Sequence, residues 1–160
     1  MAPSHNTLAE IYRAQGHYAP AERTQKLALA IREKALGPDH PNVAQSLNNL
    51  ALVHQAQGKY AQAEPLFKRA VAINKKALGP NHPYVGLFIN NLAELYRTQD
   101  KYPKAEPLYK QALAILEKTM PNHPYVAGIL DNLADLYIKM GRDDEAVPLL
   151  NRARKIRLGL

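Results

Sequence analysis

The feature that most restricts the fold of this chain is a six-residue segment that recurs at nearly regular spacing. PNHPYV stands at residues 80–85 and again at 121–126, and the near copy PDHPNV stands at 38–43. The histidines of successive copies are 42 and then 41 residues apart. A period of this length is typical of solenoids and propellers, which stack one supersecondary unit several times. Four units fit this period, at about residues 1–37, 38–79, 80–120 and 121–160.

Each unit has the sequence pattern of two helices joined by a short turn. In the second unit, apolar residues follow helical spacing over residues 43–53 and again over 63–73. Asp39 or His40 can cap the first of these helices, and Gly58 separates the two runs. Polar and apolar residues nowhere alternate with the period of two that strands require. We therefore predict an all-α chain of four helix pairs, eight helices in total.

Small residues recur where the two helices of a pair must approach each other. Because interaxial distance depends on the side chains at the contact, we expect a set of recurring alanines to lie between helices. They are Ala51, Ala93 and Ala134 in first helices and Ala21, Ala63, Ala105 and Ala146 in second helices. Proline also recurs inside the second helices, where we expect a local bend, at Pro65, Pro107 and Pro148.

The pattern in the second unit resembles the tetratricopeptide repeat. The matching residues are Leu50, Ala51, Gly58, Tyr60, Ala63, Phe67 and Ala70. The 42-residue period, the LGPxHPxV joint and the LNNLA segment resemble the kinesin light chain type of that repeat. The resemblance covers essentially the whole chain and implies a single array over residues 1–160, coiled as a right-handed superhelical solenoid of four helix pairs. The chain departs from the family pattern at His54, which replaces the first-helix tyrosine, and at Asp143, which replaces the turn tyrosine.

The resemblance also implies a binding face. Stacked helix pairs form an extended concave surface lined by first helices, and in the family this surface carries the residue before the LA pair and positions three or four away. Carried onto this chain, the residue before the LA pair is Thr7, Asn49, Asn91 or Asn132. The neighbouring positions are Glu10, Leu52, Glu94 and Asp135, then Arg13, Gln55 and Arg97, and the preceding Asn48, Asn90 and Asp131.

Asparagine has suitable chemistry for binding a peptide backbone. Its amide both donates and accepts, so it can pair with the N–H and C=O groups of an extended chain without reading its sequence. Each such bond contributes only about 0.5–1.5 kcal/mol net, so three or four with some apolar contact indicate an affinity on the order of micromolar. Alternatively, one asparagine of each pair bonds within the helix stack and bridges neighbouring units.

The net charge of +7 and the pI of about 9.6 raise the question of an acidic partner or a nucleic acid. Most lysines and arginines fall on second helices or their ends, so we interpret the charge as a solvated outer face. The tyrosines fall largely at packing positions rather than along a basic stripe, and we expect no nucleic-acid partner. The predicted groove holds too few lysines and arginines to transfer the kinesin light chain preference for acidic, tryptophan-containing cargo.

No residues indicate an enzyme, a metal site or a cofactor. His40, His82 and His123 each stand alone at a joint, without a second ligand at coordinating spacing, and we expect them to close helix starts. The chain has no cysteine, which suits a reducing compartment. It has no apolar run of about 20 residues and no signal-peptide pattern, so we expect a cytoplasmic protein without membrane contact.

The sequence thus predicts a non-enzymatic scaffold that binds a protein or peptide segment on its concave face. The alternative is a structural or oligomerisation module without a peptide ligand. Arg154 and Lys155 replace residues that are apolar or alanine in the middle units, so we expect a polar outer face on the fourth unit and an array that stops there. Self-association through the end units also remains open.

Overall fold

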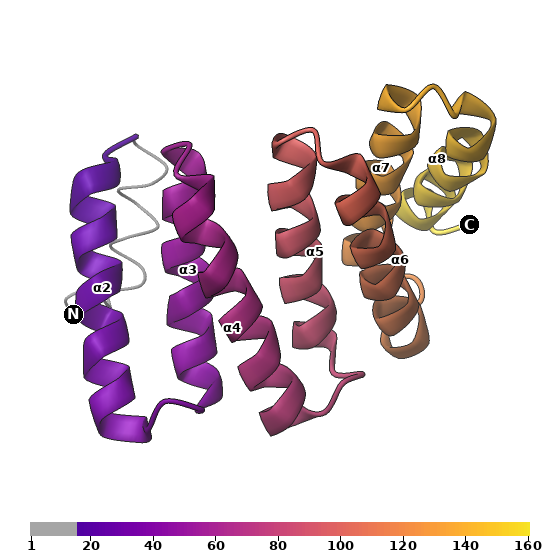
Figure 1. Ribbon diagram of the computed structural model, residues 1–160. Coiled ribbons are helices and arrows are strands. Elements are labelled where there is room, and N and C mark those ends of the chain that lie inside the picture. Colours follow the sequence, from indigo (N-terminus) through magenta and orange to yellow (C-terminus); the bar gives the residue numbers. More distant parts are fainter. Residues whose placement is uncertain (1–15) are drawn as a thin grey trace. The chain divides into compact units, whose positions relative to one another are not determined.

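A computed structural model describes residues 16–160, and this part of the chain is entirely helical, without strands. It contains seven α-helices (Figure 1). Their bounds are α2 Tyr18–Leu36, α3 Pro41–Ala56, α4 Tyr60–Leu78, α5 Pro83–Thr98, α6 Tyr102–Thr119, α7 Pro124–Lys139 and α8 Asp143–Leu158. The expected first helix, together with Thr7, Glu10 and Arg13, lies outside the described residues.

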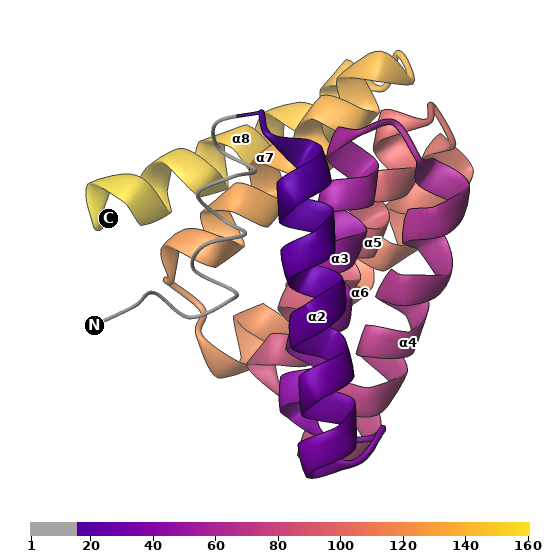
Figure 2. The same cartoon turned by 90° about the vertical axis from the view of Figure 1, so that its left-hand side faces the viewer.

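The helices follow the predicted pairing. The first helix of each complete pair packs on the second, α3 on α4, α5 on α6 and α7 on α8, while α2 packs on α3 and α6 on α7. Two orthogonal views show α2 beside α3 (Figures 1 and 2). The contacts divide the chain after Pro80 into two compact parts, each about two repeats long. From here on, unit 1 and unit 2 denote these two parts and not single repeats. Four pairs in one right-handed superhelix remain a prediction.

The recurring histidines close the starts of the first helices, as expected. His40, His82 and His123 are the N-caps of α3, α5 and α7. In each case the histidine Nδ1 accepts a hydrogen bond from the backbone N–H two residues later, at 3.0, 3.1 and 3.2 Å respectively. A proline follows each cap, where its missing N–H removes no helical hydrogen bond. The recurring hexamer therefore supplies the N-cap and first turn of α3, α5 and α7.

The recurring small residues lie at helix contacts, as predicted. Ala51, Ala93 and Ala134 are fully buried. Among the glycines of residues 16–160, Gly86 of α5 lies nearest to another helix, because a Cβ added there would lie 3.1 Å from the Leu116 side chain of α6. Phe67 and Tyr109 fill the space beside the small residues and are also fully buried. Large buried side chains thus accompany the small ones in the α3–α4 and α5–α6 pairs.

The turns between paired helices require a left-handed backbone conformation. Gly58 and Gly141 have φ of 74° and 72° at this point, a region that glycine enters without a steric penalty. Asp100 occupies the equivalent place with φ of 58° and is the one non-glycine residue with positive φ in residues 16–160. Its carboxylate accepts a hydrogen bond from the Tyr102 hydroxyl at 2.8 Å, which holds the turn locally.

The recurring prolines lie inside the second helices without ending them. Pro65, Pro107 and Pro148 are interior residues of α4, α6 and α8. Each removes one backbone donor from the helix. Their equivalent positions show that the repeat accommodates the same local defect each time.

Candidate functional site

The predicted binding residues of unit 2 lie together on the partly exposed faces of α5 and α7. All are half-buried, whereas neighbouring Leu92, Ala93, Leu133 and Ala134 are buried. The residues on α5 are Asn90, Asn91, Glu94 and Arg97, and those on α7 are Asp131, Asn132 and Asp135. The three- and four-residue spacings place them on one side of each helix. We call this set the first-helix face of unit 2.

The equivalent asparagines of unit 1 are more deeply buried than those of unit 2. Asn48 and Asn49 of α3 are only 3% and 7% exposed. The Gln45 side-chain amide donates to Oδ1 of Asn49 at 2.9 Å, within the same helix. Leu52 and Gln55 are half-buried, one and two turns further along α3. Identical sequence motifs therefore give amides of different accessibility in α3 and in α5.

Arg97 links the two first helices of unit 2. Its Nε donates to both carboxylate oxygens of Glu94, at 3.1 and 3.0 Å, within α5. Its Nη1 donates to Asp135 of α7 at 2.7 Å. Lys139 lies 3.4 Å from the same Asp135 oxygen. The predicted charged residues are thus brought together, but they neutralise one another.

The buried Tyr109 of α6 also belongs to this cluster. The hydroxyl of Tyr109 donates to Glu94 at 2.5 Å. Burial acts to raise the pKa of Glu94, but the hydrogen bonds from Arg97 and Tyr109 outweigh it and hold the pKa below its ordinary value. Burial and the hydrogen bond to Glu94 raise the pKa of Tyr109, and the hydrogen bond to Glu94 raises that of Arg97. Glu94 and Arg97 therefore stay charged near neutral pH.

The remaining polar residues of this face differ in their hydrogen bonding. Asp131 accepts a hydrogen bond from Arg157 of α8. Oδ1 of Asn90 is buried and finds no donor within residues 16–160. A buried amide oxygen without a donor loses its hydration without compensation. The Asn90 oxygen is therefore an unsatisfied acceptor enclosed within the fold, not one presented to solvent.

A second kind of polar cluster, which the sequence analysis missed, links successive second helices. Glu106 of α6 accepts hydrogen bonds from Arg142 at 2.8 Å, from Lys110 at 2.7 Å and from the Tyr137 hydroxyl at 3.2 Å. The hydrogen bond from Arg142 is the largest cause that lowers the pKa of Glu106 to about 2. Arg142 is the residue just before α8, so the cluster joins one repeat to the next.

Unit 1 contains the equivalent cluster with two changes, Lys59 in place of Arg142 and His54 in place of Tyr137. Glu22 of α2 accepts from Lys26 at 2.6 Å and from Lys59, just before α4, at 3.2 Å. The hydrogen bond from Lys26 is the main cause that lowers the pKa of Glu22 to about 2. Glutamate recurs at the 42-residue spacing here, at positions 22, 64 and 106. That recurrence is the signal from which the clusters could have been predicted.

His54 takes the place of the tyrosine in the unit 1 cluster. It is 4% exposed, and its Nδ1 finds no hydrogen-bond partner within the described residues. Burial lowers the pKa of His54, although the nearby Glu22 carboxylate acts to raise it. The neutral imidazole is therefore the favoured form in the folded protein.

Comparison with known proteins agrees with this geometry. The sequence model of the tetratricopeptide repeat matches residues 1–76, 44–118 and 87–158, which together span almost the whole chain. The chain belongs to the tetratricopeptide repeat family. No curated protein has a sequence that matches this tetratricopeptide repeat protein.

Solved structures place it near kinesin light chain-like repeats. BtubC (BKLC) from P. vanneervenii is 26% identical with a TM-score of 0.88, over 97% of this chain and 62% of BtubC. A putative kinesin light chain repeat protein of Podosopora anserina is 31% identical with a TM-score of 0.85, over 98% of this chain and 74% of that one. The predicted kinesin light chain-like type is thus confirmed. This tetratricopeptide repeat protein spans less than two thirds of the length of BtubC.

A more distant structure shows the fold alone. Aspartyl phosphate phosphatase F from Bacillus subtilis is 17% identical with a TM-score of 0.86, over 97% of this chain and 39% of that protein.

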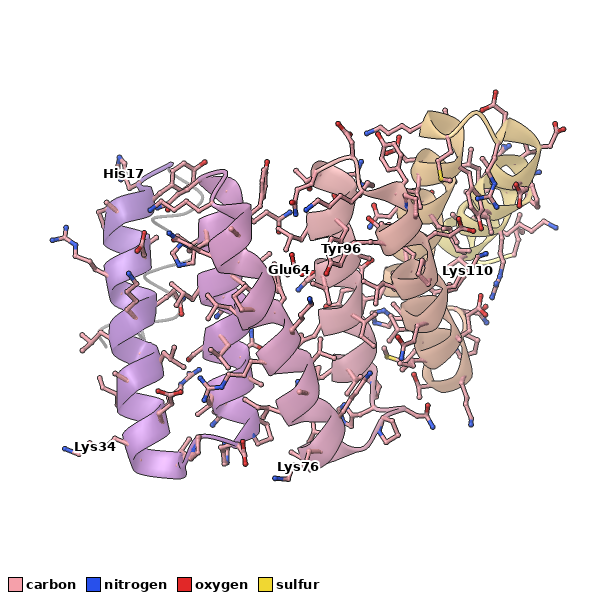
Figure 3. The ribbon with its side chains drawn as sticks, in the orientation of Figure 1. His17, Lys34, Glu64, Lys76, Tyr96 and Lys110 are labelled. Carbon is pink, nitrogen blue, oxygen red and sulfur yellow. The ribbon has the colours of Figure 1, made fainter. Side chains whose placement is uncertain are left out.

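Cations on the second helices are exposed and partly paired. Lys26, Lys68 and Lys110 each pair with the glutamate four residues earlier, and their side chains remain 58%, 55% and 56% exposed. Lys34 and Lys76 extend outward from the ends of α2 and α4 (Figure 3). These positions agree with the predicted solvated outer face.

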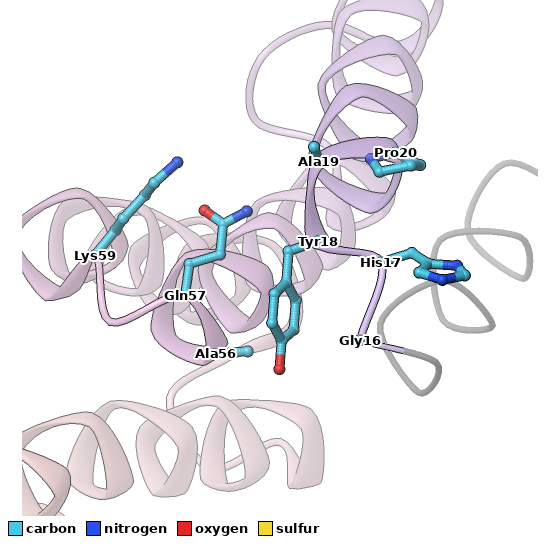
Figure 4. Close-up of a pocket in the computed structure, with 8 residues that line it drawn as sticks. All are labelled: Gly16, His17, Tyr18, Ala19, Pro20, Ala56, Gln57 and Lys59. Carbon is cyan, nitrogen blue, oxygen red and sulfur yellow. The ribbon is translucent and has the colours of Figure 1, made fainter.

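An open hollow lies where α2 begins in unit 1. It has a volume of about 630 Å³. Its lining is Gly16, His17, Tyr18, Ala19, Pro20, Ala56, Gln57 and Lys59 (Figure 4). The predicted peptide-binding residues do not line it.

Two further features concern residues 16–160, namely groups of metal-ligating side chains and membrane-spanning helices. In this part of the chain, no three histidine, aspartate or glutamate side chains are grouped to hold a metal ion. None of its helices combines the length and apolar content needed to cross a bilayer.

Proposed function

We propose that this tetratricopeptide repeat protein is a protein-interaction scaffold that binds an extended peptide segment on its first helices, chiefly on the first-helix face of unit 2. The observation that carries the proposal is the matched register of half-buried amides on α5 and α7. Asn91 and Asn132 occupy equivalent positions, each between buried core residues and the exposed side of its helix.

The chemistry of this face favours recognition of a peptide backbone. An asparagine side chain can accept from a peptide N–H and donate to the next C=O, so two such residues can fix an extended chain. Bonds of about 0.5–1.5 kcal/mol each, with some apolar contact, give an affinity on the order of micromolar. Such an affinity suits a scaffold whose partners exchange.

The charged residues of the same face disfavour an acidic ligand. The guanidinium of Arg97 is already engaged by Glu94 and Asp135. A ligand carboxylate would have to displace one of these partners and would then lie near the carboxylates of Glu94, Asp135 and Asp131. We therefore expect ligands that contribute hydrogen-bond donors and apolar side chains.

A peptide-library screen followed by titration of the selected peptide tests the proposal. The double variant Asn91→Ala and Asn132→Ala should weaken binding roughly tenfold or more, because two hydrogen bonds are lost. Helicity measured by circular dichroism should stay unchanged. Asn81→Ala, an exposed asparagine before α5, is the matched control and should leave affinity unaltered. Equal affinity of the double variant and the control would refute the proposal.

The second candidate is a structural or oligomerisation module. The buried positions of Asn48 and Asn49 and the hydrogen bond from Gln45 favour amides that serve the interior of the repeat. This alternative predicts that the screen returns no peptide and that light scattering gives a mass above that of one chain. The proposed scaffold predicts a selected peptide irrespective of oligomeric state.

A further inference from the structure

The outward side of α8 carries apolar residues that the described chain leaves uncovered, so the polar outer face expected for the fourth repeat is only partly present. Val147, Leu150 and Leu158 are 55%, 40% and 60% exposed. With Arg154 they follow the three- and four-residue steps of a single helix face. Ala146 and Ala153, on the adjacent stripe, are buried. We call Val147, Leu150, Arg154 and Leu158 the α8 outer face.

The repeat itself indicates what kind of element fits this face. One period of 41 residues earlier, the equivalent residues of α6 are Glu106, Tyr109, Leu113 and Glu117. On α6 this register is covered, because Tyr109 is fully buried and Glu106 accepts from the Tyr137 hydroxyl of α7. The element that packs there is a helix. The α8 outer face therefore has the position and spacing to receive a helix in the same way.

The charge around the face specifies the partner further. Residues 150–160 contain four cations and no carboxylate side chain. Arg152 pairs with Glu117 and Arg157 with Asp131. Arg154 and Lys155 have no ion-pair partner within residues 16–160, and with Asn151, Leu158 and Leu160 they line a hollow of about 260 Å³. An occupant must therefore supply both apolar contact and negative charge.

A second copy of this chain does not meet that requirement. If two α8 outer faces paired about a two-fold axis, the mid-face Arg154 side chains would approach each other. Like charges brought together in an interface oppose association. The basic surroundings also repel the cationic outer surface of α2, where Arg23, Lys26 and Lys34 are exposed.

We propose that the α8 outer face docks an acidic amphipathic helix from a partner protein. The apolar stripe of that helix covers Val147, Leu150 and Leu158, and its flanking carboxylates pair with Arg154 and Lys155. This surface is separate from the first-helix face of unit 2 and does not depend on the peptide binding proposed there.

Two fluorescein-labelled 16-residue peptides test this docking by fluorescence anisotropy. Both carry leucines at helical spacing, one with glutamates beside the stripe and the other with lysines. The glutamate peptide should bind, and Arg154→Glu should weaken it by roughly five- to tenfold while improving the lysine peptide. Leu150→Asn should weaken the glutamate peptide about tenfold through lost apolar burial.

Matched controls distinguish binding at the α8 outer face from non-specific binding. Lys34→Glu and Leu27→Asn make the same changes at exposed positions of α2, and both should leave glutamate-peptide affinity unchanged. Asn91→Ala with Asn132→Ala should also leave it unchanged. Equal binding of both peptides, equal effects of the α2 controls, or no effect of Arg154→Glu would overturn the proposal. So would a dimer that Leu150→Asn dissociates, or binding to phosphatidylserine vesicles without binding to the peptide.

Discussion

At the scale of single residues, one substitution within the repeat distinguishes unit 1 from unit 2. Tyr137 joins the Glu106 cluster through its hydroxyl, and the Arg142 guanidinium lies 4.3 Å from the centre of its ring. His54 occupies the same register beside Glu22 but is buried with an unsatisfied nitrogen. A histidine thus stands where the repeat elsewhere has a tyrosine.

We expect unit 1 to lose stability in mild acid because of His54. Burial lowers its pKa in the folded state below the unfolded value of about 6.5. Stability is then complete above about pH 6.5 and falls as the pH decreases from there toward the folded-state pKa, because the unfolded chain binds the proton more tightly. Urea unfolding at pH 7.5 and pH 5 measures the loss.

The variant His54→Tyr should have nearly the same free energy of unfolding at pH 7.5 and at pH 5. His17→Asn, at an exposed histidine, should still lose stability at pH 5. Glu22 and Glu106 titrate near pH 2 and do not contribute in this window. An unchanged pH dependence in His54→Tyr would contradict this explanation.

A second residue-scale prediction concerns the buried hydroxyl of Tyr109. Tyr109→Phe removes the hydrogen bond to the Glu94 carboxylate, and bonds to charged groups contribute about 1.5–3 kcal/mol. The free energy of unfolding in urea should fall by about that amount. Tyr84→Phe, at a tyrosine that is 57% exposed, should change it by less than about 0.5 kcal/mol. Similar results for the two variants would show that the Tyr109–Glu94 bond contributes little.

At the scale of helices, close packing depends on a small residue at one crossing. A Cβ on Gly86 of α5 would lie 3.1 and 3.2 Å from Leu116 and Ile115 of α6, whereas a Cβ on Gly128 of α7 has no neighbour within 4 Å outside its own helix among the described residues. The two glycines therefore form a matched pair for testing helix packing.

We expect Gly86→Val to destabilise the protein by about 1–3 kcal/mol through overpacking. Gly128→Val should be neutral or slightly stabilising, because valine has a higher helix propensity than glycine. Thermal unfolding followed by circular dichroism compares them directly. Equal melting temperatures would mean that α5 and α6 can separate at little cost.

Most of the helical framework could be predicted because its signals are local and repeated. The hexamer marks each first-helix start through the histidine cap, and glycine or Asp100 marks each turn. The site was harder to predict. Asn49 and Asn91 lie in the same NNLA motif, yet one is buried and the other half-buried. The pairing of Arg97 with Asp135 spans 38 residues, and it depends on the relative rotation of two helices, which no local pattern specifies.

At the scale of the whole molecule, the same repeat provides both the buried core and the exposed polar faces. Each compact unit contains its own buried core and its own ion-pair link between second helices. The first helices present polar side chains in a common register, and the second helices present cations. Membership of the tetratricopeptide repeat family agrees with a scaffold function, and the amides of unit 2 are the residues on which the proposed binding depends.

The most direct test follows the side-chain amide resonances of Asn90, Asn91 and Asn132 by NMR while a library-selected peptide is added. We predict that these resonances shift together and saturate at one affinity, while those of Asn81 and Asn151 stay in place. Saturable binding that leaves all three amides of the first-helix face unperturbed would contradict the proposed site.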